Sequence, residues 1–292
     1  MQQVNVALYG CGTVGAGVAA ILFGRRGALE DRLGPGIELS YIVDFRIDEL
    51  RSELDPPASV KLTEDLDEPI NDPDVDIVVE LFGGTGAARK VVEKALQAGK
   101  DVVTANKALL AAHGDELYRL ARREGNSIAF EASVAGGIPV IGAVRDALVS
   151  EKINSVYGIV NGTCNYILTQ MLERELSYEE ALAEAQEKGY AEADPTLDVE
   201  GDDSAHKLAV LARLAFGVDV AEADIYREGI TGIEPEDILY AHSLGYTVKL
   251  LAIGMRWNGQ LELRVHPALL HHEHPLAAVG GAYNAVCVHG DS

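Results

Sequence analysis

The chain has 292 residues, of which 48% are hydrophobic and 24% charged, a size and composition typical of about two globular domains with a sizeable core. This balance excludes disorder and a small disulfide scaffold, and the net charge of −22 argues against general binding to nucleic acid or anionic membranes. We expect a reduced, cytoplasmic protein: its three cysteines form no CxxC pair, and the sequence shows no signal peptide or transmembrane run.

The first part of the chain alternates short apolar runs with helical patterns. A strand at 4–10 precedes a helix at 14–23, and a loop at 24–36 leads to a second strand at 37–44. Turns fill the acidic, proline-containing stretch 55–76, with a short strand at 60–62. The remaining elements are strands at 75–83, 101–104 and 127–130 and helices at 87–98 and 108–124. This rhythm predicts an α/β fold, a Rossmann-type domain at 1–135 with a mostly parallel sheet.

The pattern changes after residue 136. A long strand at 153–160 is followed by helices at 164–175, 178–188, 202–216 and 236–245. Ser177 and Glu180 form a capping box, and Asn258-Gly259 indicates a hairpin between strands at 248–256 and 261–265. With a last strand at 283–289, residues 136–292 are expected to form an α+β domain with a mixed or antiparallel sheet.

A glycine pattern follows the first strand. Gly10, Gly12 and Gly15 fit GxGxxG at a strand-to-helix junction, where glycines allow a tight turn, close approach to a pyrophosphate and close helix–strand packing. The pattern alone is weak, and an ordinary tight turn is the alternative, but the strand–turn–helix context favours dinucleotide binding. Asp44 at the end of the second strand would bind a ribose 2′-hydroxyl, whereas Arg46 would meet a 2′-phosphate, so NAD and NADP both stay open, with Asp44 favouring NAD.

A second group of polar residues precedes the helix at 202–216. Asp203 and Lys207 are four residues apart and share a face with the apolar Val210 and Leu214, which predicts that the pair points inward. A lysine beside a carboxylate can donate or accept a proton, and an ordinary lysine with a pKa near 10.4 is protonated at neutral pH. An exposed ion pair without function is the common alternative.

Six segments, taken together, closely resemble homoserine dehydrogenases. They run in that family's order over nearly the whole chain and read ALYGCGTVGAGV, DVVTANKALL, FEASVAGGIPVI, GIVNGTCNYIL, EKGYAEADPTLDVEGDDSAHKLAVLA and HPLAAVGGAYNAVCVHG. The resemblance implies NAD(P)-dependent interconversion of L-homoserine and L-aspartate 4-semialdehyde, a step toward threonine, methionine and isoleucine. It also implies a homodimer formed through the sheet of the second domain, near residues 248–265.

The resemblance assigns roles residue by residue. Lys207 resembles the family's proton donor, Asp203 lies beside it, and Lys107 resembles the lysine that reaches both cofactor and substrate. Substrate contacts are implied for Glu192, which would hold the substrate ammonium, and for Asp198, Tyr190 and Thr163. Further cofactor contacts are implied for Thr13, Val14 and Gly189.

The segment FEASVAGGIPV resembles the family's monovalent-cation loop. Glu131, Val134, Gly136 and Ile138 would offer mainly backbone carbonyls to a sodium ion, a hard cation that prefers oxygen. Three histidines that lie close together much later in the chain, His271, His272 and His274, do not have the spacing of a metal site, because adjacent histidines seldom reach one centre.

The resemblance also shows a departure. The family continues past its last strand with a glycine-rich turn and a helix, whereas this sequence stops at Ser292. We therefore expect a short form with its C-terminus cut short and no ACT domain, hence no threonine inhibition through one. Two alternatives to a homoserine dehydrogenase are another amino-acid or aldehyde dehydrogenase on the same fold and a catalytically impaired NAD(P)-binding relative. The set Glu192, Asp203 and Lys207 favours a homoserine dehydrogenase over both alternatives.

Overall fold

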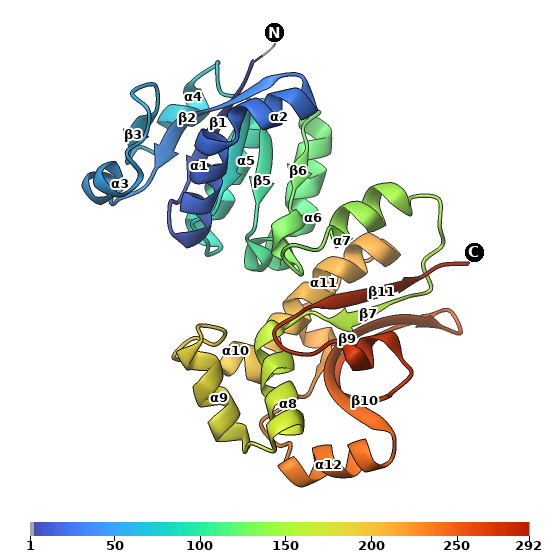
Figure 1. Ribbon diagram of the computed structural model, residues 1–292. Helices are drawn as coiled ribbons and strands as arrows, with labels where there is room; N and C mark the ends of the chain where they lie inside the picture. Colours follow the sequence, from blue (N-terminus) through green and yellow to red (C-terminus); the bar gives the residue numbers. More distant parts are fainter. Residues whose placement is uncertain (1–2, 292) are drawn as a thin grey trace. The chain divides into compact units, whose positions relative to one another are not determined.

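The computed structural model describes residues 3–291 and divides the chain into two compact units, Met1–Ser133 and Val134–Ser292 (Figure 1). The division lies close to the expected domain boundary at residues 135 and 136. Each unit contains its own sheet. Among the described residues, no helix is long and apolar enough to cross a membrane.

The first unit is built on a six-stranded sheet with the order β3-β2-β1-β4-β5-β6. All five neighbouring pairs are parallel, as expected from the alternation of strands and helices. Val6, Leu8 and Tyr9 of the first strand are all buried, because helices cover both faces of such a sheet. Its strands are β1 (Gln3–Tyr9), β2 (Gly36–Val43), β3 (Lys61–Thr63), β4 (Ile77–Glu80), β5 (Asp101–Thr104) and β6 (Ile128–Ala129).

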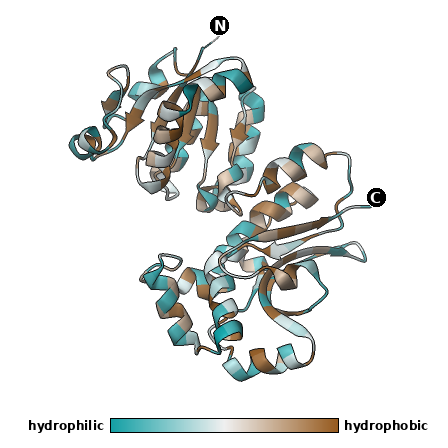
Figure 2. Ribbon diagram, viewed as in Figure 1, coloured by the Kyte–Doolittle hydropathy of each residue, from teal (hydrophilic) through white to brown (hydrophobic). Residues whose placement is uncertain are grey.

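The helices of this unit include three that the sequence pattern did not indicate. They are α2 and α3, and the four-residue α4, whose second residue is a proline. The expected loop at 24–36 is wrong in part, because residues 26–33 form α2, a polar helix that buries no residue and so lacks an apolar stripe. Figure 2 shows the apolar strands between more polar helices. The helices are α1 (Thr13–Gly24), α2 (Arg26–Leu33), α3 (Ile47–Leu54), α4 (Glu68–Asn71), α5 (Gly86–Gln97) and α6 (Lys107–Glu124).

The strand order places a topological switch point between β1 and β4. The chain runs outward from β1 to β2 and β3, then crosses back and continues outward from β4 to β6. In open parallel sheets, ligands bind at the carboxyl ends of the strands on either side of such a point. The glycine loop after β1 and the Leu81–Phe82 segment after β4 both lie there.

The second unit contains a mixed sheet with the order β11-β7-β9-β10-β8. Its pairs are antiparallel except for the parallel pair of β8 and β10. The hairpin at Asn258-Gly259 is confirmed, with both residues at positive φ, although its strands are longer than expected and pair over twelve residues each. The strands are β7 (Ser155–Ile159), β8 (Tyr226–Arg227), β9 (Tyr246–Trp257), β10 (Gln260–His271) and β11 (Ala285–His289).

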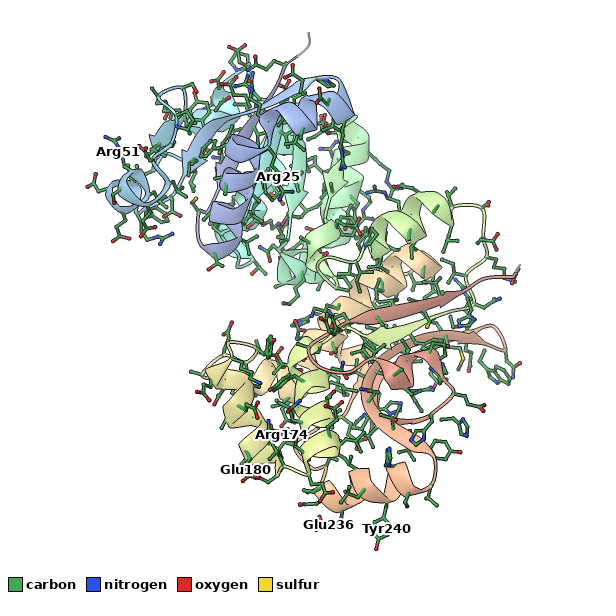
Figure 3. The ribbon with its side chains drawn as sticks, in the orientation of Figure 1. Arg25, Arg51, Arg174, Glu180, Glu236 and Tyr240 are labelled. Atoms are coloured by element: carbon green, nitrogen blue, oxygen red, sulfur yellow. The ribbon has the colours of Figure 1, made fainter. Side chains whose placement is uncertain are left out.

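Helices pack against this sheet, and α8, α11 and α12 all contact β9. The capping box of Ser177 and Glu180 is confirmed at the start of α9, and Gly189, with φ of 74°, follows its end. Arg174 at the end of α8 and Glu180 at the start of α9 lie at the same end of this helix pair (Figure 3). The helices are α7 (Val140–Gly142), α8 (Gly162–Arg174), α9 (Tyr178–Glu187), α10 (Thr196–Val199), α11 (Asp202–Phe216) and α12 (Pro235–Ser243).

Candidate cofactor and substrate sites

The glycine loop of the first unit leaves no room for side chains at two positions. Gly10 has φ of +88°, and a Cβ there would lie 2.8 Å from the backbone nitrogen of Phe82. A Cβ on Gly15 would lie 2.1 Å from the carbonyl oxygen of Gly10, so helix α1 packs directly against the loop. Gly12, the N-cap of α1, faces open space. The first N–H groups of the helix are thereby accessible to an anion.

Asp44 and Arg46 lie together beside this loop. Asp44 accepts hydrogen bonds from the backbone N–H of Cys11 at 2.8 Å and of Arg46 at 3.0 Å. The Arg46 guanidinium pairs with Asp44 at 3.3 Å and donates to the Cys11 carbonyl at 3.0 Å. Partial burial opposes ionisation of Asp44, but these hydrogen bonds outweigh it and lower its pKa. Asp44 and Arg46, the two residues expected to select the cofactor, therefore lie in contact with each other.

A cavity adjoins these residues within the first unit. It has a volume of about 110 Å³ and is lined by Gly10, Asp44, Phe45, Leu66 and Phe82, among others. Its walls are almost entirely apolar, and Asp44 is among the residues that line it. An apolar hollow beside a glycine loop and an acidic residue fits the adenosine end of a dinucleotide.

Glu80, at the carboxyl end of β4, was missed by the sequence reasoning because VVELFGG looks like a continuous buried strand. Its side chain is fully buried and accepts hydrogen bonds from the Thr104 hydroxyl at 2.7 Å and the Gly83 N–H at 3.0 Å. Asn106, the N-cap of α6, donates to the Gly84 carbonyl at 2.7 Å. These bonds connect the loop after β4 with the turn between β5 and α6. Lys107 is the first residue of α6 and follows this turn directly.

The Asp203–Lys207 pair is turned inward in the second unit, as its helical face predicted. The Lys207 Nζ lies 2.6 Å from Asp203 Oδ2, and the two side chains are only 15% and 9% exposed. The same ammonium donates to the carbonyl oxygen of Val160 at 2.7 Å, just beyond the end of β7. A paired lysine held by two oxygens at the edge of an apolar interior is well placed for proton transfer.

Asp198 and Thr163 lie beside this pair. Thr163 donates through its hydroxyl to the Tyr190 carbonyl at 2.5 Å and approaches Asp198 Oδ2 at 3.4 Å. Asn161 was not among the expected site residues, yet its amide donates to Asp198 at 2.7 Å and to Asp203 at 2.9 Å. The structure thus brings Thr163, Asp198, Asp203 and Lys207 into one network.

The remaining expected substrate contacts are more exposed. The loop after Gly189 carries Tyr190, and the centroid of its ring lies 4.9 Å from the centroid of the Tyr166 ring. Glu192 is exposed, and its backbone carbonyl accepts a bond from Gln186 at 3.0 Å. No contact of the Glu192 carboxylate joins it to Asp203 or Lys207 among the bonds described, so its substrate role stays a prediction.

Two groups of residues bear on metals and nucleophiles. The cation-loop residues Glu131, Val134, Gly136 and Ile138 span the boundary between the units. Among the described residues, no cluster of three His, Cys, Asp or Glu residues could hold a metal ion, and the sodium site of this loop stays a prediction. Burial, followed by the charges of Asp198 and Asp203, raises the pKa of the Cys164 thiol well above its usual range, which fits a packing residue.

The fold and the glycine loop define the class of the first unit. A parallel sheet of this strand order, with a glycine loop at its switch point, is a dinucleotide-binding domain of the kind found in NAD(P)-dependent oxidoreductases. Residues 10–131 match the model of the homoserine dehydrogenase NAD-binding domain, and residues 139–292 match the homoserine dehydrogenase model. The chain belongs to the homoserine dehydrogenase family.

Relatives and solved structures agree with this assignment. The chain is 45% identical over 291 residues to the homoserine dehydrogenase of Neisseria gonorrhoeae, covering 100% of this chain and 66% of that protein. It matches the crystal structure of a homoserine dehydrogenase from Thiobacillus denitrificans with a TM-score of 0.92 and 42% identity, covering 100% of this chain and 68% of that one. A mutant of a hyperthermophilic archaeal homoserine dehydrogenase in complex with NADPH matches with a TM-score of 0.82 and 26% identity, covering 99% and 89%. The chain thus spans about two thirds of the length of the curated relatives it matches.

Proposed function

We propose that this protein interconverts L-homoserine and L-aspartate 4-semialdehyde with NAD(P). The observation that carries the proposal is the buried pair of Lys207 and Asp203, connected to Asp198 through Asn161. Relatives that match the full chain at about 45% identity are named homoserine dehydrogenases, which supports the same substrate.

The residues of the second unit fit the proton chemistry of this reaction. Reduction of the aldehyde adds a hydride to carbon and a proton to oxygen, and NAD(P), when bound, supplies or accepts the hydride. A protonated Lys207 donates the proton to the carbonyl oxygen and stabilises the developing alkoxide, and in the reverse direction its amine accepts the hydroxyl proton. Asp203, at 2.6 Å, keeps the lysine aligned.

The substrate's amino-acid end requires an anionic partner. Homoserine carries an ammonium group, and the segment between α9 and α11 supplies the carboxylates of Glu192 and Asp198. We assign the ammonium to Glu192, and assign Asp198, Thr163 and the neighbouring Tyr190 to the pocket wall. Lys107 at the start of α6 is assigned to the cofactor and substrate, and Thr13, Val14 and Gly189 to the cofactor.

The cofactor is NAD or NADP. The family's NAD-binding model matches the first unit, and one archaeal relative was solved with NADPH. Asp44 suits a ribose 2′-hydroxyl, and Arg46 is close enough to meet a 2′-phosphate. We propose that both cofactors bind, with NAD favoured because Asp44, at the end of the second strand, is among the residues that line the cavity.

Assembly, cation and location complete the proposal. We further propose a homodimer through the sheet of the second unit, near residues 248–265. A light-scattering measurement that gives the mass of a single chain would contradict the homodimer.

We also propose that sodium bound at the carbonyl-rich loop raises activity relative to a buffer without monovalent metal cations. The described cysteines are all free, which fits a reducing cytoplasm.

The test is reduction of NAD⁺ and NADP⁺ at alkaline pH with L-homoserine, using D-homoserine and L-serine as controls. We expect turnover with L-homoserine alone. Turnover with L-serine but not with L-homoserine would replace the substrate assignment. Cofactor binding without turnover of any substrate would instead favour a non-catalytic relative.

A further inference from the structure

We propose that Asn161 is a positioning residue that holds the two active-site carboxylates, Asp198 and Asp203, at a fixed spacing and thereby orients Lys207. The inference rests on the proposed function, because Lys207 is taken as the proton donor. Asn161 follows β7 directly and is the N-cap of α8. The residue is 4% exposed, so water does not replace its contacts freely.

Both polar groups of the Asn161 amide, its NH₂ and its carbonyl oxygen, form hydrogen bonds. The Asn161 Nδ2 donates one hydrogen to Asp198 Oδ1 at 2.7 Å and the other to Asp203 Oδ2 at 2.9 Å. Its Oδ1 accepts the backbone N–H of Cys164 at 2.9 Å. The amide orientation is determined by this network, because a flipped amide would point its oxygen at two carboxylates and its NH₂ at an N–H donor.

Two carboxylates held close together, Asp203 buried and Asp198 partly buried, repel each other, and a neutral double donor relieves that repulsion. Asp203 Oδ2 also accepts the Lys207 ammonium at 2.6 Å, so one oxygen receives both the amide and the lysine. The residue before Asn161 supplies the carbonyl that holds the same ammonium, at 2.7 Å. Residues 160 and 161 together therefore set the position of both members of the ion pair.

The competing explanation is that Asn161 serves only as a helix cap. Asn, Asp and Ser are nearly equivalent at an N-cap, so a cap-only role tolerates either replacement. The bridging role tolerates neither. Serine is too short to reach both carboxylates, and aspartate replaces the double donor with a third negative charge. The variants Asn161→Ser and Asn161→Asp therefore separate the two roles.

The first measurement is the rate of aldehyde reduction over a range of pH. We expect kcat to fall by about 10- to 100-fold in Asn161→Ser, the loss that follows a small misplacement of a catalytic group, while the KM for the nicotinamide cofactor stays unchanged. In Asn161→Asp, the activity relative to wild type should recover as pH falls, because a protonated carboxyl can donate one of the lost bonds. Equal kcat and equal pH profiles in wild type and both variants would overturn the proposal.

A matched control exists at the other end of β7. Asn154 donates through its amide to the Asp291 carboxylate at 2.7 Å, on the surface. Asn154→Asp makes the same chemical change opposite an aspartate but outside the site. It should leave kcat and the pH profile unchanged, and a loss equal to that of Asn161→Asp would show that added negative charge alone is responsible.

A second measurement does not depend on turnover. A carboxyl at position 161 would have a pKa raised in the folded state by Asp198 and Asp203, so its variant keeps full stability only at low pH and loses it as pH rises through that value. The thermal midpoint of Asn161→Asp, compared with wild type, should therefore fall between acid and neutral pH, whereas that of Asn154→Asp should track wild type. An inactive wild-type protein would count against the proposed function, and the stability profile would still decide whether Asn161 bridges the carboxylates.

Discussion

At the scale of single residues, our proposal assigns the proton chemistry to Lys207. Replacing it with alanine should reduce turnover by at least about 10²-fold, the contribution typical of a general acid, and leave NAD(P) binding intact. Lys207→Arg should be nearly as inactive, because a guanidinium keeps the charge beside Asp203 but does not release its proton. Steady-state rates and cofactor titrations test this, with Lys152→Ala at an exposed position as the control. Near wild-type kcat in Lys207→Ala would remove its role.

Arg46 and Asp44 should divide the two cofactors between them. Arg46→Ala removes the cation that would face a 2′-phosphate, so the KM for NADP⁺ should rise about tenfold or more, and that for NAD⁺ should change less. Asp44→Asn should have the opposite bias, raising the KM for NAD⁺. Initial rates with each cofactor at saturating homoserine measure both. Parallel losses for the two cofactors would mean that the pair only supports the glycine loop through Cys11.

The residue scale also shows what a sequence pattern reveals and what it does not. Asp203 and Lys207 could be placed together because helical spacing puts them on one face. Glu80 and Asn161 could not, because their partners come from other elements, 24 and 42 residues away. A short polar residue immediately before a helix was the only signal at Asn161, and it indicates a cap rather than a bridge.

At the scale of elements, helix α1 offers a matched pair of glycines. A Cβ at Gly15 would collide with the Gly10 carbonyl, so Gly15→Ala should cost about 1–3 kcal/mol of stability and weaken cofactor binding by moving the loop. Gly17, in the same helix, is exposed and has open space around it. Gly17→Ala should raise stability by about 0.5–1 kcal/mol through helix propensity.

Chemical denaturation and cofactor titration of the two alanine variants separate packing from propensity. Equal stabilities for Gly15→Ala and Gly17→Ala would show that the loop tolerates a side chain at position 15 and would weaken its assignment to a pyrophosphate. The predicted elements succeeded where an apolar stripe or a cap specifies them, as in α5 and α9. They failed at α2, where a polar octapeptide forms a helix without burying any residue.

At the scale of the whole molecule, both domain types and the parallel first sheet were predictable, because βα alternation and turn chemistry are local signals. The lengths of β9 and β10 were not, because pairing between strands extends each beyond its apolar centre. The burial of Lys249 could not be predicted from the sequence either. Lys249 looks like a surface lysine in TVKLLAIG, yet it is 3% exposed within β9.

Lys249 should make the stability of the protein depend on pH. Burial lowers the pKa of Lys249 to about 8, with the Glu173 carboxylate opposing the shift, and its amine donates to Asn165 at 2.9 Å and to the Val279 carbonyl at 2.6 Å. Between about pH 8 and 10, the unfolded chain holds this proton and the folded chain does not, so stability should rise with pH by up to about 1.4 kcal/mol per unit. Urea denaturation of wild type and Lys249→Met across this range isolates the contribution. The difference between them should grow in favour of wild type as pH rises, because deprotonation removes the cost of burying a charge while an amine still donates to Asn165 and Val279. A difference that does not change with pH would mean that Lys249 keeps its charge when buried.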